Sequence, residues 1–269
     1  MTVKYLFSGI SGFGISLLLL TSLHASELPA QQSATQQNQE HPTFTMAFYA
    51  DPKHNLYFRW GELLYTEAFA RLGYQFSYQV VPAMRASLLA DSGKVDGEPA
   101  RVFSYGMKFQ NLVRVEEPIL ETKLLAFARN PDIRLVDWDS LKQFPYRVEY
   151  NRGIFFAEQK LVTLLPAERL TTSSSPVNSF RKLLHDRIDI YIDTAVIGFP
   201  LLQKAEFEHS KIHSVVDLET LISFAYLHKR HRLLAPKLSE TLKQMKQEGL
   251  FELYLENARL EMNRSTSPQ

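Results

Sequence analysis

Three arginines stand where the chain could capture an anion: Arg85, Arg101 and Arg152. An arginine side chain presents a planar fork of N–H donors that fits a carboxylate with two hydrogen bonds. Arg152 also lies in an Asn-Arg-Gly turn that opens a predicted helix, whose free N–H groups can hold an anion. Arg101 has a simpler alternative, since it can pair with Glu98 or Asp96, and Arg152 can be a solvated turn residue; for Arg85, too, a role outside the site is the alternative. The set predicts a site for a small anionic group.

An acidic residue, Asp193, ends the apolar stretch 188–193, which has the alternation of a strand. Open α/β sheets place their ligands at the carboxyl ends of strands, so Asp193 is a second candidate. The alternative is that it caps the helix that follows, as aspartate commonly does. Tyr49 and Trp60 could form an aromatic wall of the same site, although aromatic residues at such positions are more often part of a core.

Motifs of the common enzyme classes do not occur in the sequence. There is no Gly-x-Ser-x-Gly elbow, Walker loop, dinucleotide-binding Gly-x-Gly-x-x-Gly or His-Glu-x-x-His. The chain has no cysteine, which excludes disulfides, zinc-thiolate sites and cysteine nucleophiles. His228 and His231 are three apart, but the three cations in the same stretch would repel a metal ion. We therefore expect no catalytic residue, no metal and no cofactor.

Strand and helix patterns alternate along the chain and must position these residues. Strands are predicted at 44–49, 74–81, 95–98, 112–115, 124–128, 146–150, 169–172, 188–193, 211–216 and 221–227. Helical patterns separate many of these strands. One of Ser173–Ser175 is expected to cap the helix that begins at Pro176. A final helical stretch is expected to break at Gly249. The alternation predicts α/β units with mainly parallel sheets, occurring twice on either side of Asn130-Pro131.

The composition, with 45% apolar and 22% charged residues, is typical of a soluble globular protein. A formal charge of +1 argues against a dedicated nucleic-acid binder. Residues 1–25 combine Lys4, an apolar run and a terminal Ala25, which predicts a secretory signal peptide cleaved near Ala25; an uncleaved anchor is the alternative. Residues 26–42, rich in Gln, Ser, Ala and Pro, predict a flexible leader. We therefore expect a periplasmic protein.

Three segments carry a family resemblance. The first is a Gly-x-x-Asp turn with a downstream arginine, formed by Gly93, Asp96 and Arg101. The second is a predicted strand with an acidic end, Arg187–Asp193. The third is a C-terminal run that leads to Gly249. Over most of residues 43–260 the chain thereby resembles family 3 of the extracellular solute-binding proteins, the amino-acid-binding type of periplasmic receptor. It departs from the family's pattern after the first strand, where Ala50-Asp51-Pro52 replaces an aromatic-Pro-Pro-aromatic stretch, and before Arg101, where Pro99-Ala100 replaces the usual hydroxyl residue.

The resemblance implies an α/β, two-lobed periplasmic-binding-protein fold (type II) with mainly parallel sheets and two hinge crossings. The crossings would fall near Ala128–Pro131 and Asp217–Phe224. Lobe 1 would comprise residues 43–128 plus 222–262, lobe 2 residues 129–221, and a tail residues 263–269. In this family the arginine grips the ligand carboxylate and the second-lobe aspartate grips its ammonium group, positions that Arg101 and Asp193 match here.

Together these features predict a monomeric solute-binding protein without a nucleic-acid partner. It would capture a small polar, carboxylate-bearing or amino-acid-like ligand by hinge closure and present it to ABC-transporter membrane subunits or a sensor. The candidate ligand-binding residues are Arg101, Asp193, Arg85, Arg152, Glu98, Tyr49 and Trp60. One alternative is a lyase or dehydratase of the same fold, with Glu98 as its acid; another is a non-binding interaction module, which a cleft filled by its own side chains would favour.

Overall fold

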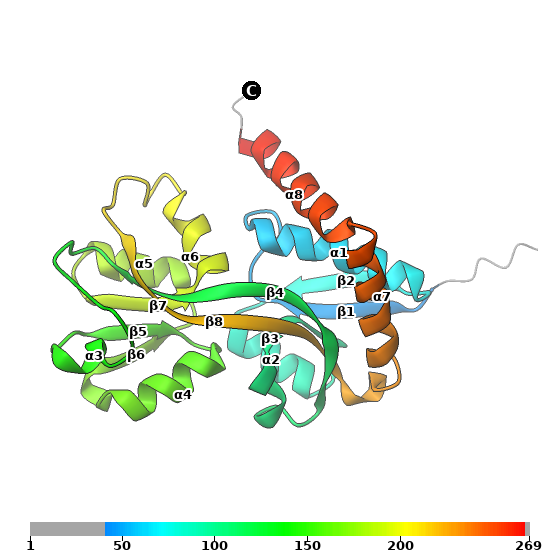
Figure 1. The fold of residues 1–269 in the computed structure, drawn as a ribbon, viewed down its shortest axis with the longest axis horizontal. Coiled ribbons are helices and arrows are strands. Elements are labelled where there is room, and N and C mark those ends of the chain that lie inside the picture. The colour runs from blue at the N-terminus through cyan, green and yellow to red at the C-terminus, as the bar shows by residue number, and fades with distance from the viewer. Residues whose placement is uncertain (1–40, 267–269) are drawn as a thin grey trace, which may run out of the picture. The chain divides into compact units, whose positions relative to one another are not determined.

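The computed structural model describes residues 41–266, which form one eight-stranded sheet with helices on both faces (Figure 1). The predicted signal peptide and most of the predicted leader lie outside the described residues. The strands are β1 (Thr43–Phe48), β2 (Gln75–Val80), β3 (Gly97–Val102), β4 (Leu112–Ala128), β5 (Val148–Asn151), β6 (Leu170–Ser173), β7 (Ile190–Thr194) and β8 (His213–His228). The α-helices are α1 (Leu56–Arg71), α2 (Ala83–Asp91), α3 (Ser140–Gln143), α4 (Phe155–Leu164), α5 (Pro176–Leu184), α6 (Ala195–Leu202), α7 (Ala235–Gln247) and α8 (Leu250–Thr266). Short 3₁₀ turns are η1 (Phe103–Met107), η2 (Ala167–Arg169) and η3 (Lys229–His231).

Two long strands join two lobes of this sheet, whose strand order is β2-β1-β3-β8-β4-β7-β5-β6. In lobe 1, β1 pairs in parallel with β2 and β3, and in lobe 2, β5 pairs in parallel with β6 and β7. The antiparallel pair β4 and β8, of 17 and 16 residues, runs through both lobes (Figure 1). The predicted fold class, α/β with two lobes and two crossings, is therefore confirmed.

The crossing strands are continuous where the sequence predicted two strands in each segment. Polar residues at 116–117 and 121–123 interrupt the apolar pattern of β4, yet its pairing with β8 continues through register shifts. Pro118 lies at one of these irregularities, where a strand tolerates a residue without an N–H group. Leu124–Phe127 already pair with β7, so β4 enters lobe 2 before residues 128–131, where we expected the crossing.

Side-chain alternation along β4 divides the core of lobe 2 between the two faces of the sheet. Leu125 and Phe127 belong to one buried cluster, whereas Leu124 and Ala126 belong to another. The first cluster also contains residues of β1 and α1, and so it extends from lobe 1 into lobe 2 without a break. The two lobes are consequently packed against each other along one face of the sheet.

The helix ends follow local sequence signals. Asn55 caps α1 by accepting from the N–H groups of Tyr57 and Phe58, and Ser175 caps α5, as the sequence predicted for this serine run. Gly249, at a φ of +74°, separates α7 from α8, which confirms the predicted break. The last helix, α8, continues to Thr266 and so includes the first four residues of the expected tail of 263–269. No helix within residues 41–266 is long and apolar enough to cross a membrane.

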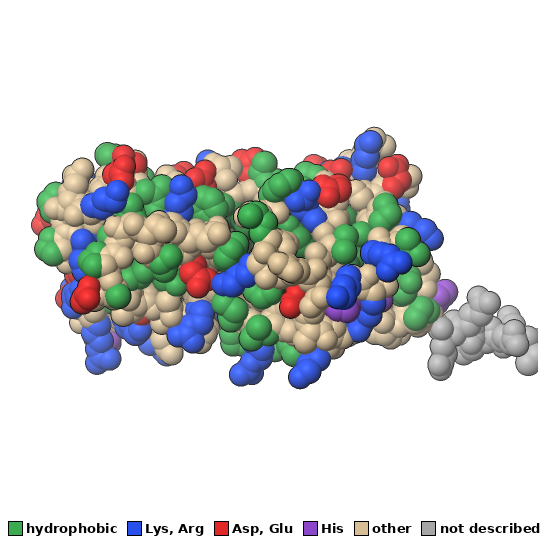
Figure 2. All heavy atoms as spheres, turned by 90° about the horizontal axis from the view of Figure 1, so that it is seen from below, with side chains coloured by type: hydrophobic (Ala, Val, Ile, Leu, Met, Phe, Trp, Pro, Cys, Tyr) green, Lys and Arg blue, Asp and Glu red, His purple; other side chains and the backbone are tan. Residues whose placement is uncertain are grey.

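Charged side chains of both signs are interspersed with hydrophobic ones on the face drawn in Figure 2.

Candidate functional site

A cavity lies between the two lobes, beside the crossing strands, and has a volume of about 50 Å³. Lobe 1 contributes residues from the ends of β1 and β3 and from η1, and lobe 2 contributes residues from β5, the start of α4, and β7. Its principal lining residues are Tyr49, Arg101 and Tyr105 from lobe 1 and Asn151, Phe155 and Asp193 from lobe 2. Aliphatic side chains of the crossing strands and α6 complete the wall, so most of the lining is apolar.

Arg101 is buried and held by several partners at once. Its guanidinium lies 2.6 Å from Glu98 Oε1, donates to the carbonyl oxygen of Ala83 at 3.0 Å, and sits 4.4 Å from the centre of the Tyr49 ring. Burial is the largest single influence on Arg101 and would lower its pKa, but the interactions with Glu98, Tyr105 and Tyr49 together outweigh burial and raise that pKa above its ordinary value. These bonds use Nε and Nη2; among the described residues none reaches Nη1, and the side chain lines the cavity.

Glu98 is fully buried and completes this cluster from behind Arg101. One of its oxygens accepts from the guanidinium, and the other accepts from the Tyr105 hydroxyl at 2.5 Å. The alternative pairing of Arg101 with Glu98 is therefore observed, whereas Asp96 bonds Thr45 N and His231 instead. Glu98 is not among the described residues that line the cavity, whereas Arg101 and Tyr105, which cover its oxygens, are.

Asp193 is also fully buried, and neutral groups surround it. Its Oδ1 accepts from Thr194 N at 2.7 Å, and its Oδ2 accepts from the Tyr191 hydroxyl at 2.6 Å and from Asn151 Nδ2 at 3.0 Å. Burial raises the pKa of Asp193 to about 6, because these hydrogen bonds offset the loss of hydration only in part. The N-cap of α6 is Thr194, so the alternative in which Asp193 caps this helix is not observed.

The charged groups on the two sides of the cavity differ in whether they have a counter-ion. Arg101 and Glu98 form a compensated pair in lobe 1. Within residues 41–266, no cationic side chain bonds Asp193 in lobe 2. A buried carboxylate without a counter-ion is costly when ionised, so a cationic group entering the cavity would be stabilised beside Asp193.

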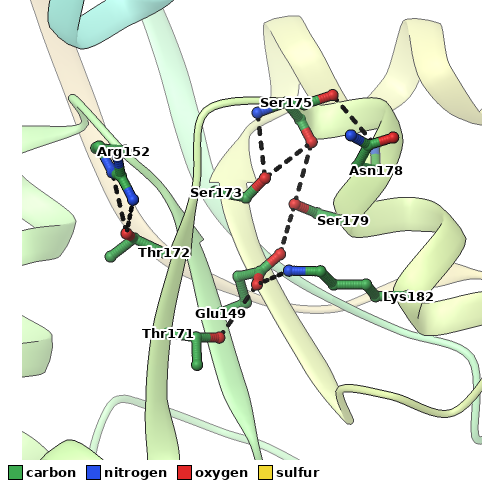
Figure 3. Close-up of polar contacts among 9 residues, drawn as sticks. All are labelled: Glu149, Arg152, Thr171, Thr172, Ser173, Ser175, Asn178, Ser179 and Lys182. Atoms are coloured by element: carbon green, nitrogen blue, oxygen red, sulfur yellow. Dashed lines mark hydrogen bonds and ion pairs between the residues drawn. The ribbon is translucent and has the colours of Figure 1, made fainter.

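The structure does not bring Arg85 or Arg152 to this cavity. Arg85 is exposed on α2, whose buried face is formed by Ala83, Ala86, Ser87 and Ala90. Arg152 is exposed and donates to Thr172 Oγ1 at 2.9 Å, as Figure 3 shows. The Asn-Arg-Gly turn positions its neighbours instead, because Asn151 lines the cavity and Gly153 lies against lobe 1.

Trp60 lines a second cavity rather than this one. Its indole N–H donates to the carbonyl oxygen of Phe251 at 2.9 Å, and its ring packs edge-on against that residue. Tyr49 lines both cavities, with its hydroxyl donating to Ala100 O at 3.2 Å.

Several direct contacts hold the lobes together around the cavity. Asn55 Nδ2 of lobe 1 donates to the Val196 carbonyl of lobe 2 at 2.7 Å, and Lys108 pairs with Glu158 at 3.0 Å. Gly153 approaches α2 so closely that a Cβ there would lie 2.7 Å from Met84 N. The cleft is thus closed, and Gly153 is one position whose small size permits the closure.

The sequence did not single out Tyr105, Phe155 or Phe156 as lining residues. Phe155 and Phe156 follow the Asn-Arg-Gly turn directly, and this position beside a candidate loop was the available signal. A third buried carboxylate, Glu149, also escaped notice; it accepts from Ser179 Oγ at 2.7 Å and pairs with Lys182, fixing α5 to β5 (Figure 3).

No protein-family model matches the chain. A protein of Shewanella oneidensis, described only as uncharacterized, is 54% identical over 251 residues, which cover 93% of this chain and 94% of the relative. The chain belongs to the same family as this Shewanella protein. The relative's description names no activity, so the family relationship by itself assigns no ligand.

Solved structures resemble the chain in fold at low sequence identity. A histidine kinase sensor domain with similarity to periplasmic binding proteins matches with a TM-score of 0.67 and 14% identity, covering 80% of this chain and 95% of that one. An amino acid ABC transporter substrate-binding protein from Streptococcus pneumoniae, bound to L-arginine, matches with a TM-score of 0.62 and 14% identity, covering 80% and 94%. The likeness establishes the two-lobed periplasmic-binding-protein fold.

Proposed function

We propose that the chain is an exported, monomeric solute-binding protein whose lobes close on a small zwitterionic ligand. The single observation that carries the proposal is that Arg101 from lobe 1 and Asp193 from lobe 2 both line one interlobe cavity. Arg101 Nη1 would donate to the ligand carboxylate, and Asp193 would receive its ammonium group. Asn151 and the ring of Tyr49 would complete the contacts.

Closure follows from a ligand that touches both lobes at once. Such a ligand binds the closed state more tightly than the open one, and the difference in affinity shifts the population toward closure. The fold is shared by a transporter substrate-binding protein and by a kinase sensor domain, which supports delivery to either a transporter or a sensor. Export would follow from the signal peptide predicted at residues 1–25.

A screen of melting temperatures, on protein purified after export, tests this proposal. The panel comprises small amino acids, amines, carboxylates and sugars. A zwitterion at a hundred times its dissociation constant should add about 2.7 kcal/mol of stability, a shift of several degrees. Arg101→Lys keeps the charge that Glu98 needs but removes the planar fork, so it should abolish the shift; Arg114→Lys, on an arginine that pairs with Glu116 outside the cavity, should not.

A second candidate function, a two-lobed interaction module that binds no solute, is favoured by the small cavity and by the direct contacts between the lobes. It predicts that no member of the panel raises the melting temperature. The geometry gives less support to a lyase or dehydratase, because its candidate acid, Glu98, lies behind Arg101 and Tyr105 and is not among the described residues that line the cavity.

A further inference from the structure

Three loops of lobe 1 are joined by hydrogen bonds: the turn between α2 and β3, the loop that follows η1, and η3 with its flanking residues. Lys229 N donates to Asn111 O at 2.7 Å. Arg230 Nη1 donates to Gly93 O at 2.6 Å. The three loops therefore form one continuous surface, which we call the basic loop surface and define as residues 91–96, 107–111 and 228–233. Its η3 segment, orange in Figure 1, lies at the lower edge of lobe 1.

The fully exposed charges of the basic loop surface are all positive. Its two acids, Asp91 and Asp96, are only partly exposed and are bonded within the surface. The exposed basic residues are Lys94, Lys108, Lys229, Arg230 and Arg232. Lysine, arginine and histidine side chains gather on the lobe 1 part of the face drawn in Figure 2. Burial and, after it, the charges of Arg230 and Lys229 lower the pKa of His228, as expected where the local potential is positive.

Several of these cations are not neutralised by the protein. Lys108 pairs with Glu158, whereas Lys94 and Arg232 make no side-chain hydrogen bond or ion pair with any part of the chain that the structure describes. Like charges held close together repel one another, and this repulsion destabilises the chain that carries them. An anionic partner would remove that cost, so the charge of the surface is complementary to a negative one.

Two apolar side chains are exposed beside these charges. Leu233 is 75% exposed and directly follows Arg232, and Met107 is 76% exposed and directly precedes Lys108. Among the large hydrophobic residues of 41–266, only Val136 is more exposed. Proteins that lie on a lipid surface combine the same two features, because headgroups neutralise the cations while apolar side chains enter the interface. An acidic protein surface would satisfy the cations but would gain little from two separate apolar side chains.

We infer that the basic loop surface binds an anionic lipid membrane, with its cations at the headgroups and with Leu233 and Met107 in the interfacial region. The surface includes neither Arg101 nor Asp193, so this inference goes beyond solute binding and stands independently of it. Such docking would keep the exported chain beside a transporter or sensor in the membrane.

The first experiment measures co-sedimentation of the exported protein with vesicles of phosphatidylglycerol and with vesicles of phosphatidylcholine. Binding should be at least tenfold tighter to phosphatidylglycerol and should weaken as salt is added. Each basic residue near an anionic surface contributes about fivefold, so the double variant Lys94→Gln, Arg232→Gln should bind roughly 25-fold more weakly. The double variant Arg187→Gln, Lys204→Gln removes the same charge from exposed positions in lobe 2 and is the matched control, with affinity within about twofold of the wild type.

The second experiment distinguishes a membrane from an acidic protein or polymer. The chain has no cysteine, so Leu233→Cys can carry a single environment-sensitive fluorophore, and Val136→Cys carries it at a similarly exposed position in lobe 2. On phosphatidylglycerol vesicles the emission from position 233 should shift to shorter wavelength, because the fluorophore leaves water. The emission from position 136 should not shift.

Three results would overturn the inference. The first is absence of binding to phosphatidylglycerol, or equal binding to both lipids, as an uncleaved anchor would give. The second is binding that the double variant Lys94→Gln, Arg232→Gln leaves unchanged. The third is charge-dependent binding without a shift at position 233, because the loops would then attract an acidic partner without entering a membrane. Solute binding by the double variant should equal that of the wild type in calorimetry, so failure of the inference leaves the proposed function untouched.

Discussion

Replacing Asp193 with asparagine should remove a pH-dependent cost from the folded state. Burial raises the pKa of Asp193 to about 6, against an ordinary value of 3.8. One pKa unit corresponds to about 1.4 kcal/mol, so full ionisation in the folded protein costs roughly 3 kcal/mol more than in the unfolded chain. The folded state holds the proton more tightly, so this contribution to stability is complete below the unfolded pKa and is lost as the pH rises through 6.

The assay is urea unfolding of the wild type and Asp193→Asn at several pH values. Between about pH 4 and pH 7, the free energy of unfolding of the wild type should fall by roughly 2 kcal/mol relative to the variant. The difference between the two proteins isolates Asp193, because all other titrating groups are common to both. Asp132→Asn, on an exposed aspartate, is the control and should give no such slope. A difference that stays constant with pH, or one of opposite sign, would refute the reasoning.

The same carboxylate links pH to ligand binding. A ligand ammonium beside Asp193 requires the ionised form, so affinity should decrease as the pH falls below about 6, approaching tenfold per pH unit. A ligand that placed only a carboxylate near Asp193 would bind more tightly in acid, which would contradict the proposed orientation.

Three further predictions test the closure, the packing and the export. Gly153→Ala should weaken ligand binding at least tenfold, because its Cβ would meet Met84 N at 2.7 Å. Gly73 also has a positive φ, of +79° against +104° for Gly153, but a Cβ there meets nothing within 4 Å, so calorimetry should show unchanged affinity for Gly73→Ala. Gly198→Ala should lower the free energy of unfolding by about 1–3 kcal/mol in urea, because its Cβ would lie 2.1 Å from the Phe127 ring; an unchanged value would show that α6 packs differently. N-terminal sequencing of the exported protein should begin at Ser26, and a first residue of Met1 would support an uncleaved anchor.

Local signals in the sequence predicted the features that depend on neighbouring residues. Ser175 caps α5, Gly249 ends α7, and Asp193 lies near the end of a strand whose neighbours alternate between faces. The two-lobed fold was predicted from such elements together with the resemblance. These predictions succeeded because capping and strand alternation are fixed within a few residues of chain.

The sequence could not predict which charges meet across the fold. Arg85, Arg101 and Arg152 look alike as residue types, but only Arg101 lines the cavity, because β3 and α2 bring it beside Glu98 and Ala83. The continuity of β4 across Pro118 was hidden for a similar reason, since its partner β8 lies about a hundred residues later and supplies the ladder. The closeness of Gly153 to α2 likewise depends on the approach of two lobes.

The central claim is that one zwitterion is held from both lobes, by Arg101 and by Asp193. The most direct test is a calorimetric titration with valine and with two analogues that each lack one charged group, isobutylamine and isovalerate. The account predicts that both analogues bind at least tenfold more weakly than valine, because each leaves one of the two groups without its partner. Binding of either analogue as tightly as valine would contradict it.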